Sequence, residues 1–553
     1  MTPALVAGSV SAAERRPNIV VVVMDDFGIG HFAPLAQLER TGQFDPAFVD
    51  FLKRHDAAYT PQEALDFARR AMPTMLQLGR HGAVFSNSFA TSNLCAPSRC
   101  GVLTGRLQNR MGLYQNSDVE YVGLPKGVVL AERLQKAGYA TGFIGKWHAG
   151  VRNESLREGV LKKHGATQQQ LAGLDEKKRA NIEREIRATG YLGAVIPEHN
   201  PLRHGFDYYF GYNRYECPFY DSEHIWENYT YTGLQKQYNT ELFTSKAIEF
   251  IQRARQQGKP FFVELATHAV HGPLKPKAPD RYFNKFPSKS YDLTNFYAHV
   301  NAVDEGVAAI RDAIGEEWNN TLFIFCADNG APVAMATPLP GNAPFHGHKG
   351  TFIQGGIRTP MLAHWPAKFS GGQRREELVS MLDIMPTALD AAGVAPPTGL
   401  DGASLLPLLT GKAKIVHEHL IWAGIHSRAW GFTGETVIGG ASQRREESPG
   451  AWVTTDGRYL LRFVTTTPPQ LFRELPDGAP AHFELFDIRE DPGETRNLYD
   501  QIPQVARRLE EVYKKQARTF PPPARWRADR WREMVPPDNI HLKQGAASAT
   551  PNR

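Results

Sequence analysis

The chain has 553 residues, of which 42% are hydrophobic and 22% are charged, a composition typical of a globular protein with one large and one smaller domain. The net charge of +5 comes from 63 basic and 58 acidic side chains, and so mild an excess argues against a nucleic-acid partner. No apolar run approaches the roughly 18 residues that a membrane-spanning helix needs, so we expect no membrane span.

Residues 1–15 are predicted to form a leader or the remnant of a signal segment. A short apolar stretch at 4–10 is followed by the small residues Ser11, Ala12 and Ala13, as at the end of a secretory signal. No basic residue precedes this stretch, so a disordered leader is the alternative. The pattern favours a periplasmic or secreted protein over a cytoplasmic one.

Four apolar runs rich in β-branched residues predict buried strands, at residues 18–24, 140–144, 261–265 and 322–326. Helical stretches at 130–136 and 245–255 lie between these runs. Strands that alternate with helices predict an α/β fold, with a large mixed, mainly parallel sheet flanked by helices.

Polar side chains follow each of these predicted strands directly. The first strand is followed by Asp25 and Asp26, the second by Lys146 and His148, the third by His268 and His271, and the fourth by Asp328 and Asn329. Open α/β sheets bind their ligands at the carboxyl ends of the strands. Carboxylates and an amide, together with a lysine and histidines, therefore predict a metal-dependent site for an anion at this edge.

The catalytic domain is predicted at residues 16–410, with polar, helix-prone insertions at about 32–72 and 151–196 that we expect at the rim of the site. Beyond residue 410 the pattern changes, because alternating segments flank Asp456-Gly457 and a helical stretch follows at 504–517. We expect a smaller C-terminal α+β domain at 411–520, an antiparallel sheet plus a helix. Residues 521–553 form a tail rich in proline, tryptophan and arginine.

The pentapeptide Cys-Ala-Pro-Ser-Arg at 95–99, with Thr-Gly at 104–105, resembles the signature of the type I, formylglycine-dependent sulfatases. Residues 138–148 are similar to a second signature of this arylsulfatase-like family, which belongs to the alkaline phosphatase superfamily. Shorter similarities extend over residues 16–517, at 25–26, 204–207, 328–330, 349–360 and 485–498. The resemblance implies a sulfuric ester hydrolase.

In that family the signature cysteine is oxidised to formylglycine (3-oxoalanine) by the formylglycine-generating enzyme, which reads C-x-P-x-R; Cys95, Pro97 and Arg99 match this pattern. One hydroxyl of the aldehyde hydrate attacks sulfur and releases the alcohol, and the other then expels sulfate. Pro97 suits a first helical turn, so Cys95 is expected just before a helix N-terminus, where anions are favoured. A buried structural cysteine is the alternative interpretation.

The resemblance also implies one calcium ion per chain, held by Asp25, Asp26, Asp328, Asn329 and the group derived from Cys95. Oxygen ligands suit such a hard cation. One Asp pair alone would more often cap the following segment, but a second acidic strand end favours a metal. The ion would polarise the sulfate and lower the pKa of a hydrate hydroxyl.

Six catalytic positions follow from the resemblance, namely Cys95, Arg99, Lys146, His148, His271 and Lys349. Arg99 and Lys146 would hold the hydrate and the sulfate, and His148 would take the proton when sulfate is expelled. Lys146, His271 and Lys349 would bind the sulfate oxygens. Either His271 or Lys349 would protonate the leaving oxygen of a small-molecule or saccharide sulfate ester.

Two alternatives remain from the sequence. A phosphodiesterase or phosphonate monoester hydrolase of the same superfamily would share the metal ligands but tends to lack some of the sulfate-contacting cations. A non-catalytic sulfoglycan-binding protein would have lost some of the catalytic residues.

His268 is expected to have a structural role, and Cys100 is expected to form no disulfide with Cys95. Many relatives place a serine or a similar polar residue near the site in the segment that corresponds to residues 211–218. The sequence leaves open which of Arg214, Tyr215 and Glu216 faces the substrate here.

Overall fold

The computed structural model describes residues 16–521, except 37–38, 41–42, 333–338, 426–449 and 466–480, together with residue 524. The predicted leader at 1–15 lies outside the described residues, and so does the predicted tail apart from residues 521 and 524. None of the helices in the described part of the chain combines the length and the apolar character needed to cross a bilayer.

A ten-stranded sheet forms the centre of the structure, in the order β13-β4-β12-β11-β1-β10-β6-β7-β8-β9. Its strands are β1 (Asn18–Met24), β4 (Ala83–Phe85), β6 (Ala140–Lys146), β7 (Tyr208–Tyr212), β8 (Trp226–Glu227), β9 (Thr230–Tyr231), β10 (Phe261–Ala266), β11 (Thr321–Ala327), β12 (Met361–His364) and β13 (Gln373–Arg375). The strands from β11 through β1, β10 and β6 to β7 are parallel, whereas β12 is antiparallel to both of its neighbours. The predicted mixed, mainly parallel sheet is confirmed.

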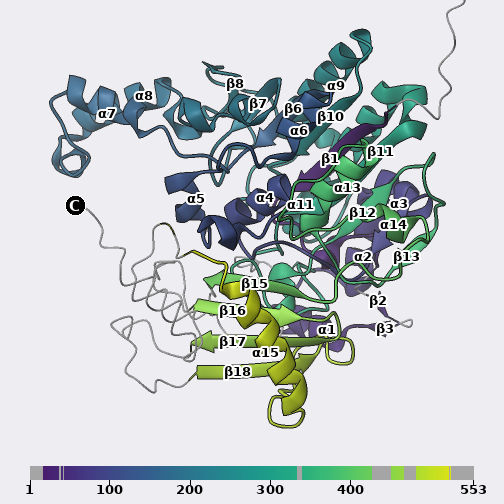
Figure 1. Cartoon of the computed structure of the whole chain (residues 1–553). Coiled ribbons are helices and arrows are strands. Elements are labelled where there is room, and N and C mark those ends of the chain that lie inside the picture. Colours follow the sequence, from purple (N-terminus) through teal and green to yellow (C-terminus); the bar gives the residue numbers. More distant parts are fainter. Residues whose placement is uncertain are drawn as a thin grey trace, which may run out of the picture.

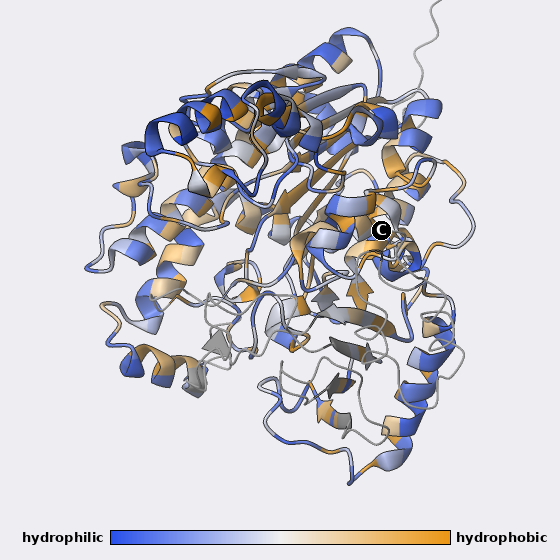
Figure 2. Ribbon diagram, turned by 90° about the vertical axis from the view of Figure 1, so that its left-hand side faces the viewer, coloured by the Kyte–Doolittle hydropathy of each residue, from blue (hydrophilic) through white to orange (hydrophobic). Residues whose placement is uncertain are grey.

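Helices cover both faces of this sheet because its central strands are apolar on both sides. Val20 and Val22 of β1 face a core shared with α2 (Pro61–Ala71), α3 (Pro73–Arg80), α9 (Asn239–Gln256) and α11 (Tyr291–Ile314). Val21 faces a second core shared with α4 (Cys95–Thr104), α6 (Leu130–Lys136), α13 (Ile384–Ala391) and α14 (Leu406–Leu409). Figure 2 shows hydrophobic strands inside and hydrophilic ribbon on many of the outer helices.

Two predicted boundaries differ from the structure by two residues or more. Strand β6 continues through Gly145 and Lys146, because both residues pair with β7, at Gly211 and Tyr212. A side chain at Gly211 would clash with the Gly145 carbonyl, so the strands approach this closely only with glycine there. Helix α9 begins earlier than predicted, at Asn239.

The other strands and α-helices before residue 400 are β2 (Glu39–Arg40), β3 (Gln43–Phe44), α1 (Pro46–Arg54), β5 (Ser88–Phe89), α5 (Asn116–Val122), α7 (Glu154–Lys163), α8 (Glu176–Ala188), α10 (Asp280–Phe283), α12 (Gln354–Ile357) and β14 (Val379–Ser380). Helix α2, from the predicted insertion at 32–72, packs on α11. Helices α7 and α8, from the insertion at 151–196, pack on each other and share their own small core (Figure 1).

The C-terminal part is the predicted antiparallel sheet with one helix. The strands β15 (Leu420–Ile425), β16 (Gly450–Thr455), β17 (Tyr459–Thr465) and β18 (Ala481–Asp487) follow one another in space, and α15 (Pro503–Ala517) packs on the sheet. Trp452 stacks on Tyr513 of α15 with ring centroids 4.1 Å apart. The predicted hairpin turns at Asp456-Gly457, where the Asp456 carboxylate accepts from the Tyr459 amide at 2.7 Å.

A largely buried ion pair joins Asp383, directly before α13, to the segment before β15, since His417 Nε2 lies 2.6 Å from Asp383 Oδ1. Burial alone lowers the pKa of His417, but the Asp383 carboxylate outweighs it and raises this pKa above its usual value. The pair therefore stabilises the fold fully below the unfolded pKa of about 6.5, and the contribution is lost as the pH rises through the higher folded pKa.

His417→Gln should lower the free energy of unfolding by about 1.5 kcal/mol at pH 6 and by clearly less at pH 9, because the charged hydrogen bond exists only at the lower pH. Denaturant unfolding at both pH values measures this difference. His419→Gln is the control, since His419 is 33% exposed and its acidic partner, Glu418, is 4.0 Å away and 84% exposed. An equal loss at both pH values would contradict the assignment of a charged His417.

Candidate active site

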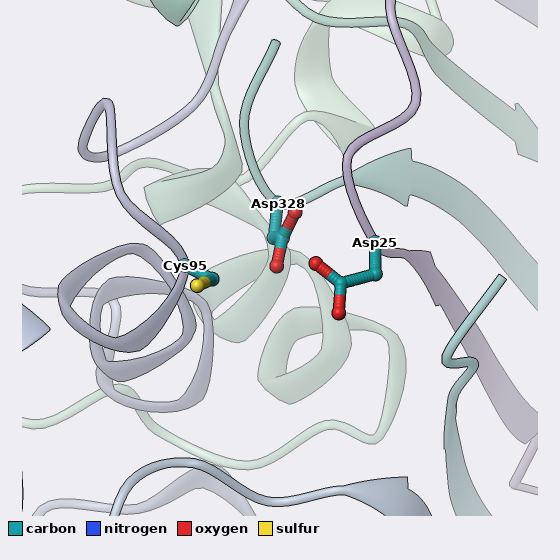
Figure 3. A group of neighbouring side chains, drawn as sticks. All are labelled: Asp25, Cys95 and Asp328. Atoms are coloured by element: carbon teal, nitrogen blue, oxygen red, sulfur yellow. The ribbon is translucent and has the colours of Figure 1, made fainter. Parts of the chain in front are cut away.

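Four parallel strands deliver acidic and basic side chains to one edge of the sheet, as their order β11-β1-β10-β6 requires. Asp25 follows β1 and Asp328 follows β11, and one ligand atom from each lies within 4.8 Å of Cys95 Sγ and of the other. Figure 3 shows these three side chains around one point, with Cys95 on its helix and the carboxylates at the strand ends. Residues more than 200 positions apart in the sequence thus form one cluster.

Helix α4 begins at Cys95 itself, whereas the sequence predicted that Cys95 would lie just before the helix. Leu94 precedes it in an extended conformation, and Pro97 lies in the first turn. The Asn116 side chain holds this helix start, because its oxygen accepts from the Ala96 amide at 3.1 Å and its nitrogen lies 3.8 Å from Cys95 Sγ. The thiol is therefore fixed at a helix N-terminus, where the helix dipole favours an anion.

The electrostatic surroundings distinguish Cys95 from the other cysteines. Burial by itself raises the pKa of this thiol, but Lys146 and Lys349, with a hydrogen bond and the charge of His148, hold it well below its usual value. Burial raises the pKa of Cys100 to well above that of an ordinary thiol. All four cysteines are free, so the expectation that Cys95 and Cys100 are unpaired is confirmed.

The buried carboxylates are balanced by cations. Lys146 Nζ donates to Asp25 Oδ2 at 2.6 Å, and the Arg99 guanidinium lies 2.8 Å from Asp328 Oδ2. Burial raises the pKa of Asp25 despite Lys146 and Arg99, and burial with the neighbouring Asp25 raises the pKa of Asp328 to about 6. The neighbouring cations offset part of the cost of burying these carboxylates.

Asp26 is held in an unusual conformation, with a φ of 59° that non-glycine residues rarely adopt. Its amide donates to Asp328 Oδ1 at 3.2 Å, and Asn329 Nδ2 donates to Asp26 Oδ1 at 2.7 Å. Burial raises the pKa of Asp26, but Lys349 and His271 outweigh that effect and lower it. The surrounding contacts over-determine this backbone, as is common at functional sites.

Two buried oxygens of this cluster, Asp25 Oδ1 and Asn329 Oδ1, accept no hydrogen bond from any described residue, and a third, Asp328 Oδ2, has only its ion pair with Arg99. A buried oxygen without a donor is costly, and a bound cation removes that cost. Carboxylate and amide oxygens are ligands that calcium prefers. The donor set therefore fits a hard divalent cation.

Lys349 and His271 form the outer side of the site. Lys349 Nζ lies 2.7 Å from Asp26 Oδ1, and His271 Nε2 lies 3.7 Å from Asp26 Oδ2. Their side chains are 9% and 14% exposed, whereas those of Arg99 and Lys146 are 2% and 0% exposed. A ligand from solvent therefore reaches Lys349 and His271 first.

His148 and His268 have different surroundings. His148 is buried with a φ of 46°, and its Nε2 lies 3.4 Å from Glu120 Oε1. His268 Nδ1 lies 3.1 Å from the Tyr212 hydroxyl, and its ring packs on Phe219, in keeping with the structural role expected for it.

Three contacts of the site were not predicted. Asn116 and Glu120 lie on α5, where no sequence pattern marked them. In the segment at 211–218, the Tyr215 carbonyl accepts from Lys146 Nζ at 2.7 Å. Every residue has a main-chain carbonyl, so residue types in the sequence could not indicate that this one binds Lys146.

Comparison with known proteins agrees with this geometry. A protein-family model described as Sulfatase matches residues 17–394. The chain belongs to the sulfatase family. This sulfatase is 32% identical over 424 residues to the uncharacterized sulfatase YdeN of Escherichia coli, a similarity that covers 75% of this chain and 70% of that protein.

Two further relatives have names that state an activity. This sulfatase is 29% identical over 527 residues to arylsulfatase A of Bos taurus, covering 92% of this chain and 87% of the relative. It is 26% identical over 430 residues to N-acetylgalactosamine-6-sulfatase of Homo sapiens, covering 72% and 67%. The protein is therefore a sulfuric ester hydrolase.

Solved structures show the same fold. The crystal structure of Ps i-CgsB in complex with k-i-k-neocarrahexaose has a TM-score of 0.66 and 21% sequence identity, covering 97% of this chain and 98% of that one. The likeness extends over nearly the whole length of both chains, so it includes the small C-terminal sheet as well as the large one.

Proposed function

We propose that this sulfatase hydrolyses aryl or carbohydrate sulfate esters with one calcium ion and a formylglycine at position 95, and releases inorganic sulfate. The observation that carries the proposal is the convergence of Asp25, Asp328 and Cys95, whose ligand atoms lie within 4.8 Å of one another. Sulfate-binding cations surround this cluster, so one small region holds groups suited to a metal, a nucleophile and an anion.

Asp25, Asp26, Asp328 and Asn329, with the group at position 95, would hold the calcium ion. The ion would supply positive charge that polarises a sulfate oxygen and lowers the pKa of a neighbouring hydroxyl. The two buried oxygens that lack donors among the described residues, on Asp25 and Asn329, support this assignment.

Conversion of Cys95 to formylglycine would supply a hydrated aldehyde, with one hydroxyl to attack sulfur and a second whose deprotonation regenerates the aldehyde. Cys95, Pro97 and Arg99 provide the pattern that a formylglycine-generating enzyme reads, so that enzyme is the proposed partner in maturation. Co-production with it should raise the specific activity. The segment at 4–10 supports a periplasmic or secreted location, which cell fractionation tests.

The remaining side chains would bind the sulfate and move protons. Lys146, His271 and Lys349 would contact its oxygens, which spread the negative charge. Arg99 would hold Asp328 and the end of β6 in place, since it pairs with Asp328 and donates to the Lys146 carbonyl at 3.1 Å. His148 would accept a proton from the group at position 95, and His271 or Lys349, on the outer side, would protonate the leaving oxygen.

Lys349→Ala should lower kcat/KM for an aryl sulfate by about 100-fold or more, because one cation that faces the developing charge is lost. Steady-state kinetics measure this effect. Lys163→Ala is the matched control, because Lys163 is 68% exposed and pairs with Glu185 on the α7–α8 hairpin. An equal kcat/KM in the wild type and in Lys349→Ala would show that Lys349 does not bind the sulfate.

The reaction class is tested by a comparison of an aryl sulfate with an aryl phosphodiester. We expect kcat/KM to be at least about 100-fold higher for the sulfate, because the cations are arranged for one sulfate group. The opposite preference would favour the phosphodiesterase or phosphonate monoester hydrolase alternative.

The natural substrate class is tested with a panel of sulfated mono- and oligosaccharides. The names arylsulfatase A and N-acetylgalactosamine-6-sulfatase of two relatives support both aryl and carbohydrate esters. Release of sulfate from any sugar of the panel, with a kcat/KM above that for the aryl ester, would identify a carbohydrate sulfatase.

A further inference from the structure

Helix α5 touches two groups of the site from one face. Its first residue, Asn116, contacts Cys95, and Glu120, four residues later, contacts His148. Residues four apart lie above each other on the same side of a helix. The short helix therefore fixes the thiol position and the His148 ring together.

The Glu120 side chain is only 25% exposed, and it is charged. Burial raises its pKa, but the hydrogen bond and the charge of His148, followed by the charges of Arg152 and Arg214, outweigh burial and lower it. An ionised carboxylate can only accept hydrogen bonds. In the 3.4 Å contact the proton therefore belongs to His148 Nε2.

The other ring nitrogen of His148 is then the basic one. His148 Nδ1 is buried and has no hydrogen-bond partner within the described part of the chain. A neutral imidazole with its proton on Nε2 carries the lone pair on Nδ1. Asn116 and Glu120, one turn apart on α5, contact Cys95 and His148, so the ring is held close to position 95.

We propose that Glu120 is a positioning residue that fixes the Nε2–H form and the orientation of His148, so that Nδ1 can take a proton from the group at position 95. The inference rests on the proposed function for the origin of that proton. The proton moves from a hydroxyl at position 95 to Nδ1, the O–H bonding pair stays with the oxygen, and Glu120 keeps its charge beside the imidazolium.

Glu120→Ala and Glu120→Gln test whether Glu120 acts as the hydrogen-bond acceptor for His148. Glutamine retains an oxygen that can accept from Nε2–H, whereas alanine does not. Glu185→Gln is the matched control, because Glu185 also contacts a histidine, His164, at 3.1 Å but lies on α8 in the insertion.

The first readout does not depend on activity. Nitrogen-15 NMR of labelled histidines, with His148 assigned from His148→Asn, is recorded on protein that keeps the Cys95 thiol. We expect the Nε2–H form of His148 in the wild type and in Glu120→Gln, and a mixture of both forms in Glu120→Ala. Glu185→Gln should leave the His148 signals unchanged.

The second readout is steady-state kinetics of the modified enzyme. We expect kcat to fall about 10- to 100-fold in Glu120→Ala, and less in Glu120→Gln, while KM changes little. An unchanged kcat in both variants would overturn the inference. A raised KM with unchanged His148 signals would also overturn it, since Glu120 would then bind the substrate instead.

Failure of folding is checked by thermal unfolding of each variant. If Glu120→Ala does not fold, Glu120→Leu takes its place, because leucine is of similar size and has no acceptor; unchanged His148 signals and a wild-type kcat in that variant overturn the inference. The proposed function fails differently: an active wild type with no formylglycine would overturn it and leave the NMR result standing.

Discussion

Cys95→Ala should lower kcat for aryl sulfate hydrolysis by at least about 10⁴-fold while the protein stays folded, because the nucleophile cannot form without the thiol. Alanine favours the first turn of α4, and the lost sulfur leaves only a small cavity beside Asn116. We expect a stability change of no more than about 1 kcal/mol. Kinetics and thermal unfolding of the same preparation measure both effects.

Cys100→Ala is the control, since Cys100 lies on the same helix and is also buried, but belongs to the hydrophobic core. It should lose some stability and keep kcat within a few-fold of the wild type. Normal turnover in Cys95→Ala, or an equal loss of activity in both variants, would contradict the assignment of Cys95.

Asp328→Asn should abolish tight calcium binding and lower kcat/KM about 1,000-fold. The substitution keeps the size of the side chain but removes one charge from the ligand set and leaves Arg99 without its nearest carboxylate, at 2.8 Å. Calcium content after dialysis, together with activity on an aryl sulfate, measures both losses.

Asp207→Asn is the control for this substitution. Asp207 accepts from the Thr141 amide at 3.0 Å, near the start of β6 and away from the strand end that carries the site. It should keep its calcium and its activity. A chelator should inactivate the wild type and calcium should restore it; calcium binding in Asp328→Asn equal to that of the wild type would exclude Asp328 as a ligand.

The main sheet and its functional edge could be predicted because their signals are local. The run at 18–24 is apolar and β-branched throughout, which indicates a strand buried on both faces, and Asp25 and Asp26 interrupt it abruptly. The same pattern holds for β11 and Asp328. Parallel strands bring such ends together, so spacing and polarity were sufficient to place them at one edge.

Other contacts could not be predicted because their partners are distant or lack a pattern. Lys349 and Asp26 are 323 positions apart, and only the fold makes them an ion pair. Glu120 lies on a seven-residue helix, too short for a hydrophobic period to show which face it presents. The Tyr215 carbonyl is main chain, so its contact with Lys146 leaves no trace in residue type.

The most direct test is mass spectrometry of the peptide that spans Cys95, taken from protein whose sulfatase activity has first been measured. We expect the thiol to be replaced by an aldehyde oxygen in a fraction of molecules that rises in proportion to specific activity. Fully active protein in which every Cys95 retains its sulfur would contradict it.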